Sequence, residues 1–362
     1  MAAVTIEVSP IELTADTILN KGINLYGGSG SGKSTVILHF MNILKDQVGQ
    51  IIVISPSDPT NHTYSGTWGD GKGVVPLPLI HYTITDGLLK SIWERQEALS
   101  QIYKQADDLS VMERLFRRLN LVNVNRAIET AEAKKAQSIT EIRKNTTNEV
   151  DAERECDVVR AKFDGFIKMI YRRNIIKYRD QLTLFDLDPG ERHCLKYIDL
   201  NPRLLLIFDD CSSMLNGLNA DSRKIMQEVY FRGRWVNITT INAVHDDKML
   251  SLELRKNAHI TICTNAQAAT TFFGRPGSGF GTDMKRLVGR IVGTVFREGA
   301  FCKLLYMRSE EKLYLFTAAK QTVPFVFGNE AILAYCEKIA STDTITVDTN
   351  NRFYDYFRST PR

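Results

Sequence analysis

Residues 23–40 read INLYGGSGSGKSTVILHF, and this stretch decides the fold. The apolar run at residues 23–26 has the length of a short buried strand, and the apolar spacing of residues 36–44 favours a helix. Between them lies a glycine-rich loop that fits the pattern G-x-x-x-x-G-K-[ST], the Walker A motif. The sequence therefore predicts a strand, a phosphate-binding loop and a helix, in that order.

The loop is chemically suited to phosphate groups. Its glycines permit a turn in which backbone N–H groups point inward, and the N-terminus of the following helix adds positive potential. We expect Lys33 to contact the β- and γ-phosphates of ATP and Ser34 to bind Mg²⁺. The predicted cofactor-binding residues of the loop are Gly27, Gly28, Ser29, Gly30, Ser31, Gly32, Lys33, Ser34 and Thr35.

A predicted strand in the second half of the chain, residues 204–208, is followed by the acid pair Asp209 and Asp210, which is the Walker B pattern. If the carboxyl end of this strand lies beside the phosphate loop, the first acid can hold Mg²⁺ and the second can face an attacking water. We therefore expect Asp209 to be a ligand of metal and nucleotide, and Asp210 to be catalytic. The alternative is that Asp210 is a helix cap or a turn residue.

Two arginines occur in the segment FRGRW at residues 231–235, between a predicted helix and a predicted strand at residues 236–244. An arginine in such a turn can reach the γ-phosphate held by a neighbouring subunit, where its charge stabilises the transition state. Arg234 is the candidate, with Arg232 behind it. The alternative is a basic pair on the surface without a catalytic role.

Composition limits the classes of protein to consider. The chain has 362 residues, enough for about two domains or for one domain with a large insertion. Its 43% hydrophobic and 24% charged residues exclude collagen-like and wholly disordered chains. A net charge of +4 is too small to identify a polyanionic partner. Six separated cysteines fit a reducing compartment, and the absence of an apolar run of roughly 18 residues predicts no membrane insertion.

Short strands alternate with helices at both ends of a long helical stretch, which predicts a mostly parallel sheet covered on both faces. For about 95 residues after Gly87 there is no proline and one glycine, so we expect two or three long amphipathic helices, closed by Asp188-Pro189-Gly190. The expected organisation is a first half of the core with Walker A (1–86), a helical insertion (87–190), a second half with Walker B and the arginine turn (191–325), and a C-terminal helix and tail (326–362).

The phosphate loop, the acid-ended strand and the Gly233-Arg234 turn together resemble the FtsK/HerA superfamily of hexameric translocases. Within it, the chain looks most like the poxvirus-type DNA-packaging ATPases of large nucleocytoplasmic DNA viruses. A second strand that runs into a proline (residues 54–56), with Thr, Asn, His and Ser close behind (residues 60–65), is typical of that branch. The resemblance covers about residues 20–300 and implies an α/β, RecA-like P-loop NTPase fold.

Carried over residue by residue, the resemblance implies ATP and Mg²⁺ at the loop and Asp209, water activation by Asp210, and an arginine, Arg234, acting on a neighbouring subunit. With Lys33, these last two form the expected catalytic set. Members of the family usually have a glutamine that senses the γ-phosphate at the end of their fourth strand. The corresponding strand here, residues 236–244, ends at His245. Its imidazole could take that place in nucleotide binding, Asn242 is the other option, and His245 could equally have no role.

The resemblance also implies a homo-oligomeric ring, expected to be a hexamer, that moves double-stranded DNA into a capsid. Capsid or portal-vertex proteins would be its partners, in the host cytoplasm or with the virion. Basic residues of the insertion could contact DNA or capsid, although such a run is more often a solvated helix face: Arg160, Lys162, Lys168, Arg172, Arg173, Lys177 and Arg179. A second basic group beside a glycine-rich loop could grip DNA phosphates: Arg275, Lys285, Arg286, Arg290 and Arg297.

Three alternatives remain open from the sequence. A cellular FtsK/HerA-type translocase or helicase in DNA repair or transfer would share all of these motifs. A structural ATPase of the SMC or Rad50 kind needs a Ser-Gly-Gly signature before Walker B, and residues 193–201 contain none. A small-molecule kinase is disfavoured by the second acid, Asp210, and by the lack of an arginine-rich lid.

Overall fold

The computed structural model describes residues 8–66, 73–275, 280–297 and 302–340. The chain folds into two compact units, one of Met1–Ala98 with Pro202–Pro361 and one of Leu99–Asn201. The middle of the second glycine-rich loop, beside the basic residues Arg275 and Lys285, lies outside the described residues (276–279), and so does the predicted tail after Ala340.

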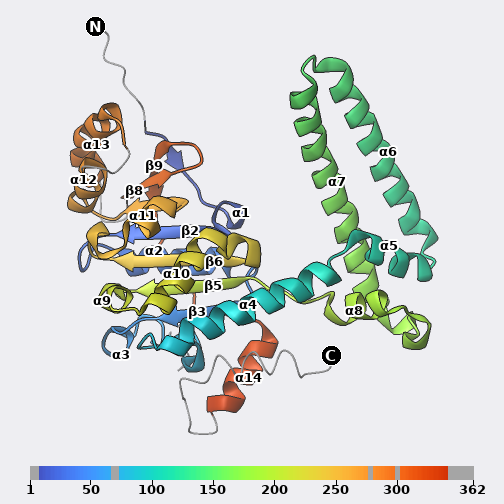
Figure 1. Cartoon of the computed structure of the whole chain (residues 1–362), viewed down its shortest axis with the longest axis horizontal. Coiled ribbons are helices and arrows are strands. Elements are labelled where there is room, and N and C mark those ends of the chain that lie inside the picture. The colour runs from blue at the N-terminus through green and yellow to red at the C-terminus, as the bar shows by residue number, and fades with distance from the viewer. Residues whose placement is uncertain (1–7, 67–72, 276–279, 298–301, 341–362) are drawn as a thin grey trace. The chain divides into compact units, whose positions relative to one another are not determined.

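Within the described residues, the strands of the first unit form one nine-stranded sheet in the order β1-β9-β8-β7-β2-β6-β5-β3-β4 (Figure 1). The pairs β7–β8 and β8–β9 are antiparallel and the other pairs are parallel. The strands are β1 (Pro10–Ile11), β2 (Gly22–Tyr26), β3 (Gln50–Ile54), β4 (Ile80–His81), β5 (Leu204–Asp209), β6 (Ile238–Val244), β7 (Ile260–Cys263), β8 (Cys302–Met307) and β9 (Lys312–Thr317).

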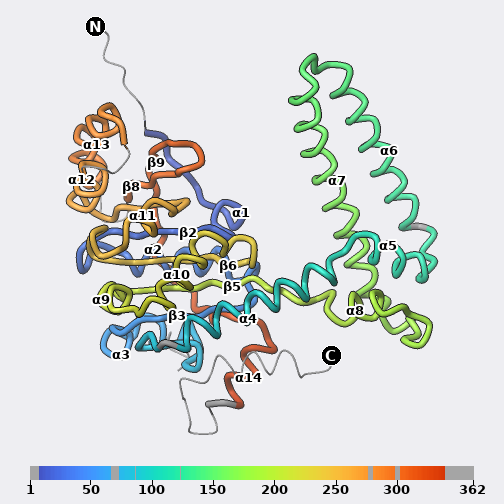
Figure 2. The backbone as a smooth tube through the Cα atoms, in the orientation of Figure 1, coloured from blue at the N-terminus to red at the C-terminus, as the bar shows by residue number. Residues whose placement is uncertain are grey.

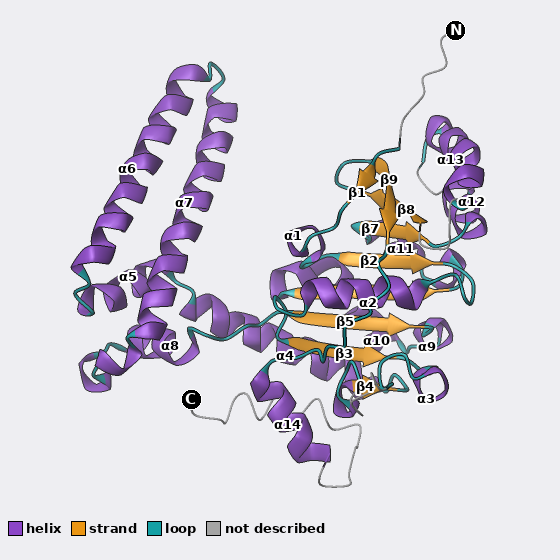
Figure 3. Ribbon diagram, turned by 180° about the vertical axis from the view of Figure 1, so that it is seen from behind, coloured by secondary structure: helices purple, strands orange, loops and turns teal. Residues whose placement is uncertain are grey.

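Helices cover both faces of this sheet, which explains why β2, β3, β5, β6 and β7 are buried along their whole length. On one face, α2 packs Val36, Phe40 and Leu44 into a core that also contains residues of α14 (Figure 3). On the other face, α10, α11, α12 and α13 contribute to a second core. The helices of this unit are α1 (Ala15–Ile18), α2 (Lys33–Leu44), α3 (Asp58–Asn61), α9 (Ser212–Asn216), α10 (Ala220–Arg232), α11 (Leu252–Asn257), α12 (Ala266–Gly274), α13 (Thr282–Val295) and α14 (Glu330–Ala340).

The order of the central strands identifies the type of fold. Strand β2 leads into the phosphate loop and β5 carries the acid pair, and β6 lies between them (Figure 1). This separation of the two motif strands by a third parallel strand is the arrangement of RecA-like P-loop NTPases, so the predicted fold class is confirmed. Strand β4 has only two residues, and a 3₁₀ turn, η1 (Leu77–Leu79), directly precedes it.

The second unit is helical, and α4 (Asp86–Ala106) leads into it from β4 (Figure 2). Its further helices are α5 (Leu109–Arg118), α6 (Val122–Asn145), α7 (Glu149–Lys177) and α8 (Pro189–Tyr197). The chain is broken into more helices than the two or three expected, because polar residues start new helices without proline or glycine. Asp108 accepts hydrogen bonds from two backbone N–H groups of α5, and Asn148 accepts one from α7.

Asp188-Pro189-Gly190 begins a helix, whereas we expected it to close the insertion. Asp188 accepts a hydrogen bond from the backbone N–H of Glu191, and the Glu191 side chain accepts one from the backbone N–H of Asp188. This reciprocal capping, with proline in the first turn, is a strong helix start. The compact unit accordingly continues to Asn201.

Candidate nucleotide site

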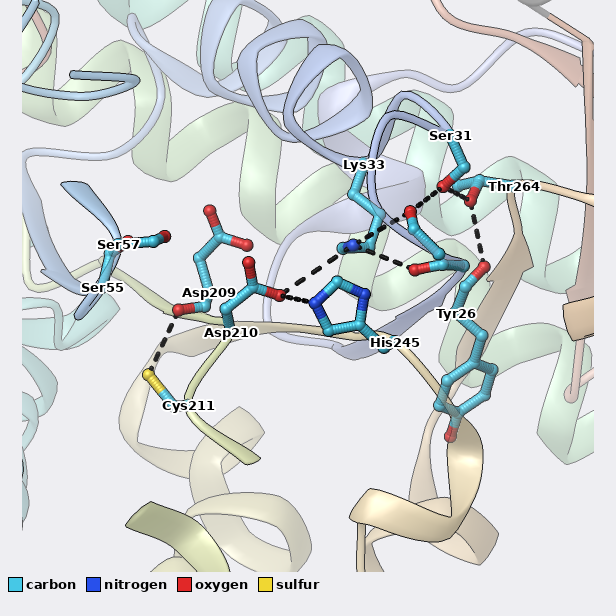
Figure 4. A network of polar contacts seen from close by, with 12 residues as sticks. Tyr26, Ser31, Lys33, Ser55, Ser57, Asp209, Asp210, Cys211, His245 and Thr264 are labelled. Atoms are coloured by element: carbon cyan, nitrogen blue, oxygen red, sulfur yellow. Dashed lines mark hydrogen bonds and ion pairs between the residues drawn. The ribbon is translucent and has the colours of Figure 1, made fainter. Parts of the chain in front are cut away.

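The carboxyl ends of four neighbouring strands meet at one edge of the sheet and bring the motif residues together (Figure 4). Backbone hydrogen bonds continue the strand pairing into the loops: Gly27 N donates to Val244 O (3.2 Å), Asp210 N to Ala243 O (3.0 Å), and Thr264 N to Tyr26 O (2.8 Å). The phosphate loop, the acid pair and the end of β6 are therefore fixed next to one another, as the sequence predicts.

Close packing explains why the loop begins with glycine. A Cβ atom on Gly27 would lie 1.8 Å from Thr264 Oγ1 and 2.5 Å from Ser31 Oγ. The two hydroxyls are themselves 2.6 Å apart, so Thr264, at the end of β7, ties down the middle of the loop. Gly32 has φ 90°, a left-handed conformation that glycine adopts without strain, and α2 starts directly after it.

Lys33 lies folded over its own loop. Its side chain is 7% exposed, and Nζ donates hydrogen bonds to the carbonyls of Gly27 (2.9 Å) and Gly28 (3.3 Å). The same Nζ lies 3.9 Å from Asp210 Oδ1. The ammonium is thus at the point where the loop and the acid pair meet.

A second lysine, Lys303 of β8, supports the loop and was not predicted from the sequence. It is 2% exposed, and its Nζ donates to the carbonyl of Ser31 (2.7 Å) and, at 3.4 Å, to that of Thr264. Burial lowers the pKa of Lys303. Its one signal in the sequence is a lysine at the start of an otherwise apolar strand, which also fits a solvent-facing position.

Asp209 is 3% exposed. Burial, and then the neighbouring carboxylate of Asp210, raise the pKa of Asp209 to about 6. The hydroxyl of Tyr64 opposes this shift, because it donates a hydrogen bond to Asp209 Oδ2 at 2.9 Å. A carboxylate in this setting gains from a nearby cation, since the cation offsets both the burial and the repulsion between the two acids.

Asp210 projects toward the loop from a left-handed backbone conformation, with φ 56°. Figure 4 shows its carboxylate between Lys33 and His245, whose Nε2 lies 3.3 Å from Asp210 Oδ1. No side chain caps the N-terminus of α9, the helix that follows, so Asp210 is not a helix cap, although it does lie in the turn between β5 and α9. His245 therefore joins the site through Asp210.

The residues present fit a magnesium ion. Ser34 and Asp209 offer the hydroxyl and carboxylate oxygens that Mg²⁺ prefers. Asp210 Oδ1 accepts no hydrogen bond within the described part of the chain, and its charged neighbours are the Lys33 ammonium at 3.9 Å and the His245 ring at 3.3 Å. These atoms all belong to the edge of the sheet that holds the phosphate loop.

Arg234 lies at the amino ends of the parallel strands, opposite the phosphate loop. It belongs to η4 (Gly233–Val236), directly before the N-terminus of β6, and its exposed side chain stacks on Trp235, 4.7 Å from the ring centroid. The phosphate loop follows the C-terminus of β2, which runs parallel to β6. Arg234 is thus separated from its own loop by the length of the sheet, and Arg232 pairs with Glu228 at 3.1 Å.

Several basic residues that could contact DNA are engaged within the chain. Lys168 and Arg172 of α7 both pair with Asp107, at 2.9 Å and 2.6 Å. Arg160 pairs with acids of its own helix, and Arg275 pairs with Asp247 at 2.7 Å. The exposed members of the two basic groups are Lys162, Arg173, Lys177, Arg286, Arg290 and Arg297.

Sequence comparison finds similar proteins in African swine fever virus, and no family model matches the chain. Protein B354L of isolate Tick/South Africa/Pretoriuskop Pr4/1996, described as uncharacterized, is 28% identical over 368 residues, which covers 98% of this chain and 97% of the relative. B354L of isolate Pig/Kenya/KEN-50/1950 is 28% identical over 366 residues, with 97% and 96% covered. The similarity therefore extends over nearly the whole length of this chain and of its relatives.

Solved structures similar to this chain include the genome-packaging NTPase B204 of Sulfolobus turreted icosahedral virus 2 in complex with ATP-γ-S. Its identity is 12% and its TM-score 0.36, with 83% of this chain and 98% of that chain covered. The pCW3 conjugation coupling protein TcpA is 13% identical with a TM-score of 0.35, covering 90% of this chain and 65% of that one.

Among the described helices, none combines the length and the apolar character that crossing a membrane requires. The chain combines the strand order β2-β6-β5 with a phosphate loop after β2 and an acid pair at the end of β5. The chain has the fold and the phosphate-binding loop of a RecA-like P-loop NTPase.

Proposed function

We propose that this protein hydrolyses ATP with Mg²⁺ at the phosphate loop and uses the reaction to move double-stranded DNA during the packaging of a viral genome. The observation that carries the proposal is the meeting of Asp210 with Lys33, 3.9 Å apart, at the carboxyl edge of the sheet. A phosphate-binding cation and a candidate base for water are thereby placed in one site.

Each residue of the site has a role in this proposal. Lys33 binds the β- and γ-phosphates, and Ser34 and Asp209 would hold Mg²⁺, which supplies charge neutralisation for the phosphates when bound. Asp210 orients the attacking water and accepts its proton. His245, in contact with Asp210, keeps that carboxylate directed toward the loop. Its ring would also contact the γ-phosphate of bound ATP.

Arg234 supports an assembly in which subunits complete one another's sites. Arg234 is exposed and lies at the opposite end of the strands from its own phosphate loop, so its guanidinium is placed to contact the phosphates held by a neighbouring subunit. A closed ring with repeated contacts of this kind, which we propose to be a hexamer, would give every loop one arginine.

Similarity to African swine fever virus proteins over nearly the whole chain favours packaging over the cellular translocase alternative. The FtsK/HerA resemblance supplies double-stranded DNA as the substrate that is moved, and capsid or portal-vertex proteins as partners in the host cytoplasm. The two arginines of α13, Arg286 and Arg290, are exposed and are candidates for contacts with DNA phosphates.

Negative-stain electron microscopy tests the proposal directly. We expect the purified protein, mixed with a non-hydrolysable ATP analogue and duplex DNA, to form rings threaded on the DNA, and Lys33→Ala protein to form none with the analogue. Monomers that ignore both nucleotide and DNA would contradict it.

A further inference from the structure

A fully buried tyrosine lies behind the acid pair. Tyr64 follows α3, in the segment between β3 and β4, and its hydroxyl donates a hydrogen bond of 2.9 Å to Asp209 Oδ2. The sequence pattern at residues 60–65 is typical of one family branch, but it assigns no functional role to any residue of this segment. The contact joins a loop after β3 to the end of β5, the neighbouring strand.

The backbone of Tyr64 is held on both sides. Its N–H donates to Asp58 Oδ1 at 2.7 Å, and its carbonyl accepts from Val75 N at 3.1 Å. Asp58 is itself fully buried, and its Oδ2 accepts no hydrogen bond within the part of the chain that the structure describes. A buried carboxylate used to fix one backbone N–H is costly in a protein interior, so the position of Tyr64 is closely specified.

The hydrogen bond restricts the carboxylate of Asp209. An ionised carboxylate only accepts hydrogen bonds, so the tyrosine must be the donor, and its fixed ring sets the direction of Oδ2. Oδ1 of Asp209 accepts no hydrogen bond from any described residue, which leaves this oxygen for an ion. Residues that fix a metal ligand in this way usually change metal affinity by about 10- to 100-fold when removed.

We propose that Tyr64, held in place by Asp58, positions Asp209 for Mg²⁺ by occupying Oδ2 and leaving Oδ1 to the ion. This inference rests on the proposed function, since it concerns the Mg²⁺ that accompanies ATP at the phosphate loop. It makes Tyr64 a positioning residue that acts through Asp209, without contact to the nucleotide.

Tyr64→Phe removes the hydroxyl and keeps the ring, and Tyr230→Phe is a matched control. Tyr230 is also a buried tyrosine of this unit, and its hydroxyl donates to Asn24 Oδ1 at 3.0 Å, on the sheet face that packs against α10. Binding of a fluorescent, non-hydrolysable ATP analogue is measured in EDTA and then over a range of Mg²⁺ concentrations. Mn²⁺ binding by electron paramagnetic resonance gives a second readout of the same site.

We expect Tyr64→Phe to bind the analogue in EDTA like the wild type and to need about tenfold more Mg²⁺ or Mn²⁺ for half-saturation. Tyr230→Phe should match the wild type in both. Asp58→Ala, which frees the backbone of Tyr64, should shift the metal requirement in the same direction. If Tyr64→Phe does not fold, this second variant decides the inference by the same measurements.

The outcomes separate the inference from the proposed function. A wild-type protein whose analogue binding ignores Mg²⁺ overturns both. A wild type that responds to Mg²⁺ beside a Tyr64→Phe protein with an unchanged metal requirement overturns the role of Tyr64 alone. Loss of analogue binding in EDTA by folded Tyr64→Phe would also overturn it, because the tyrosine would then support the loop itself.

Discussion

Lys33 Nζ lies 3.9 Å from Asp210 Oδ1, and this contact connects the first turn of α2 with the end of β5. The lysine also donates to two carbonyls of its own loop, so its charge is shared between the loop and the acid pair. A change at Asp210 therefore alters the surroundings of the cation that binds phosphate, as well as the candidate base.

Asp210→Asn should retain Mg²⁺-dependent ATP binding and lose hydrolysis by about 10²- to 10⁴-fold, because the amide keeps the shape but cannot accept a proton from water. Calorimetry measures the binding and phosphate release measures the turnover. Asp221→Asn, an exposed acid in the first turn of α10, is the control and should hydrolyse ATP normally. Turnover of Asp210→Asn within a few-fold of the wild type would move the base elsewhere.

Arg234→Ala should leave ATP binding intact and remove the hydrolysis that appears on assembly, because the arginine would serve a neighbouring loop. Mixing Arg234→Ala with Lys33→Ala subunits should restore part of the activity, since intact loops of the first would meet intact arginines of the second. The measurement is phosphate release across mixing ratios. Mixed rings that form and stay inactive, or normal hydrolysis by Arg234→Ala alone, would exclude the trans arginine.

The phosphate loop and the acid pair could be predicted from the sequence because each is a local pattern whose chemistry follows from residues close together in the chain. The mostly parallel sheet followed from the alternation of strands and helices. Tyr64, Thr264 and Lys303 could not be assigned, since their contacts join segments far apart in the sequence. The extra helix starts at Asp108 and Asp188 were not predicted, because an acidic cap can start a new helix where no proline or glycine marks a break.

Asp107→Ala should destabilise the helical unit by about 2 kcal/mol, because Asp107 is 19% exposed and pairs with both Lys168 and Arg172. Chemical denaturation followed by circular dichroism measures the change. Asp151→Ala removes an exposed pair within one helix and should cost less than about 0.5 kcal/mol. Equal effects of the two variants would show that the Asp107 pairs are not structural.

His81 should make the protein less stable in mild acid. Burial, and then the charge of Arg95, lower the pKa of His81 to about 4, whereas an unfolded histidine titrates near 6.5. Below pH 6.5 the unfolded chain binds the proton first, so this contribution to the free energy of unfolding falls as pH decreases, by roughly 2 kcal/mol at pH 5. Between pH 7.5 and pH 5, the melting temperature of His81→Gln should fall less than that of the wild type. An equal fall in melting temperature for the two proteins would refute this prediction.

Steady-state ATP hydrolysis, measured with and without duplex DNA over a series of salt concentrations, tests the central claim most directly. The account predicts that DNA stimulates hydrolysis, that the stimulation weakens steeply with salt as counterions compete for the DNA phosphates, and that Lys33→Ala abolishes it. An ATPase that is indifferent to duplex DNA at every salt concentration, or activity that survives Lys33→Ala, would contradict a DNA-translocating ATPase at this loop.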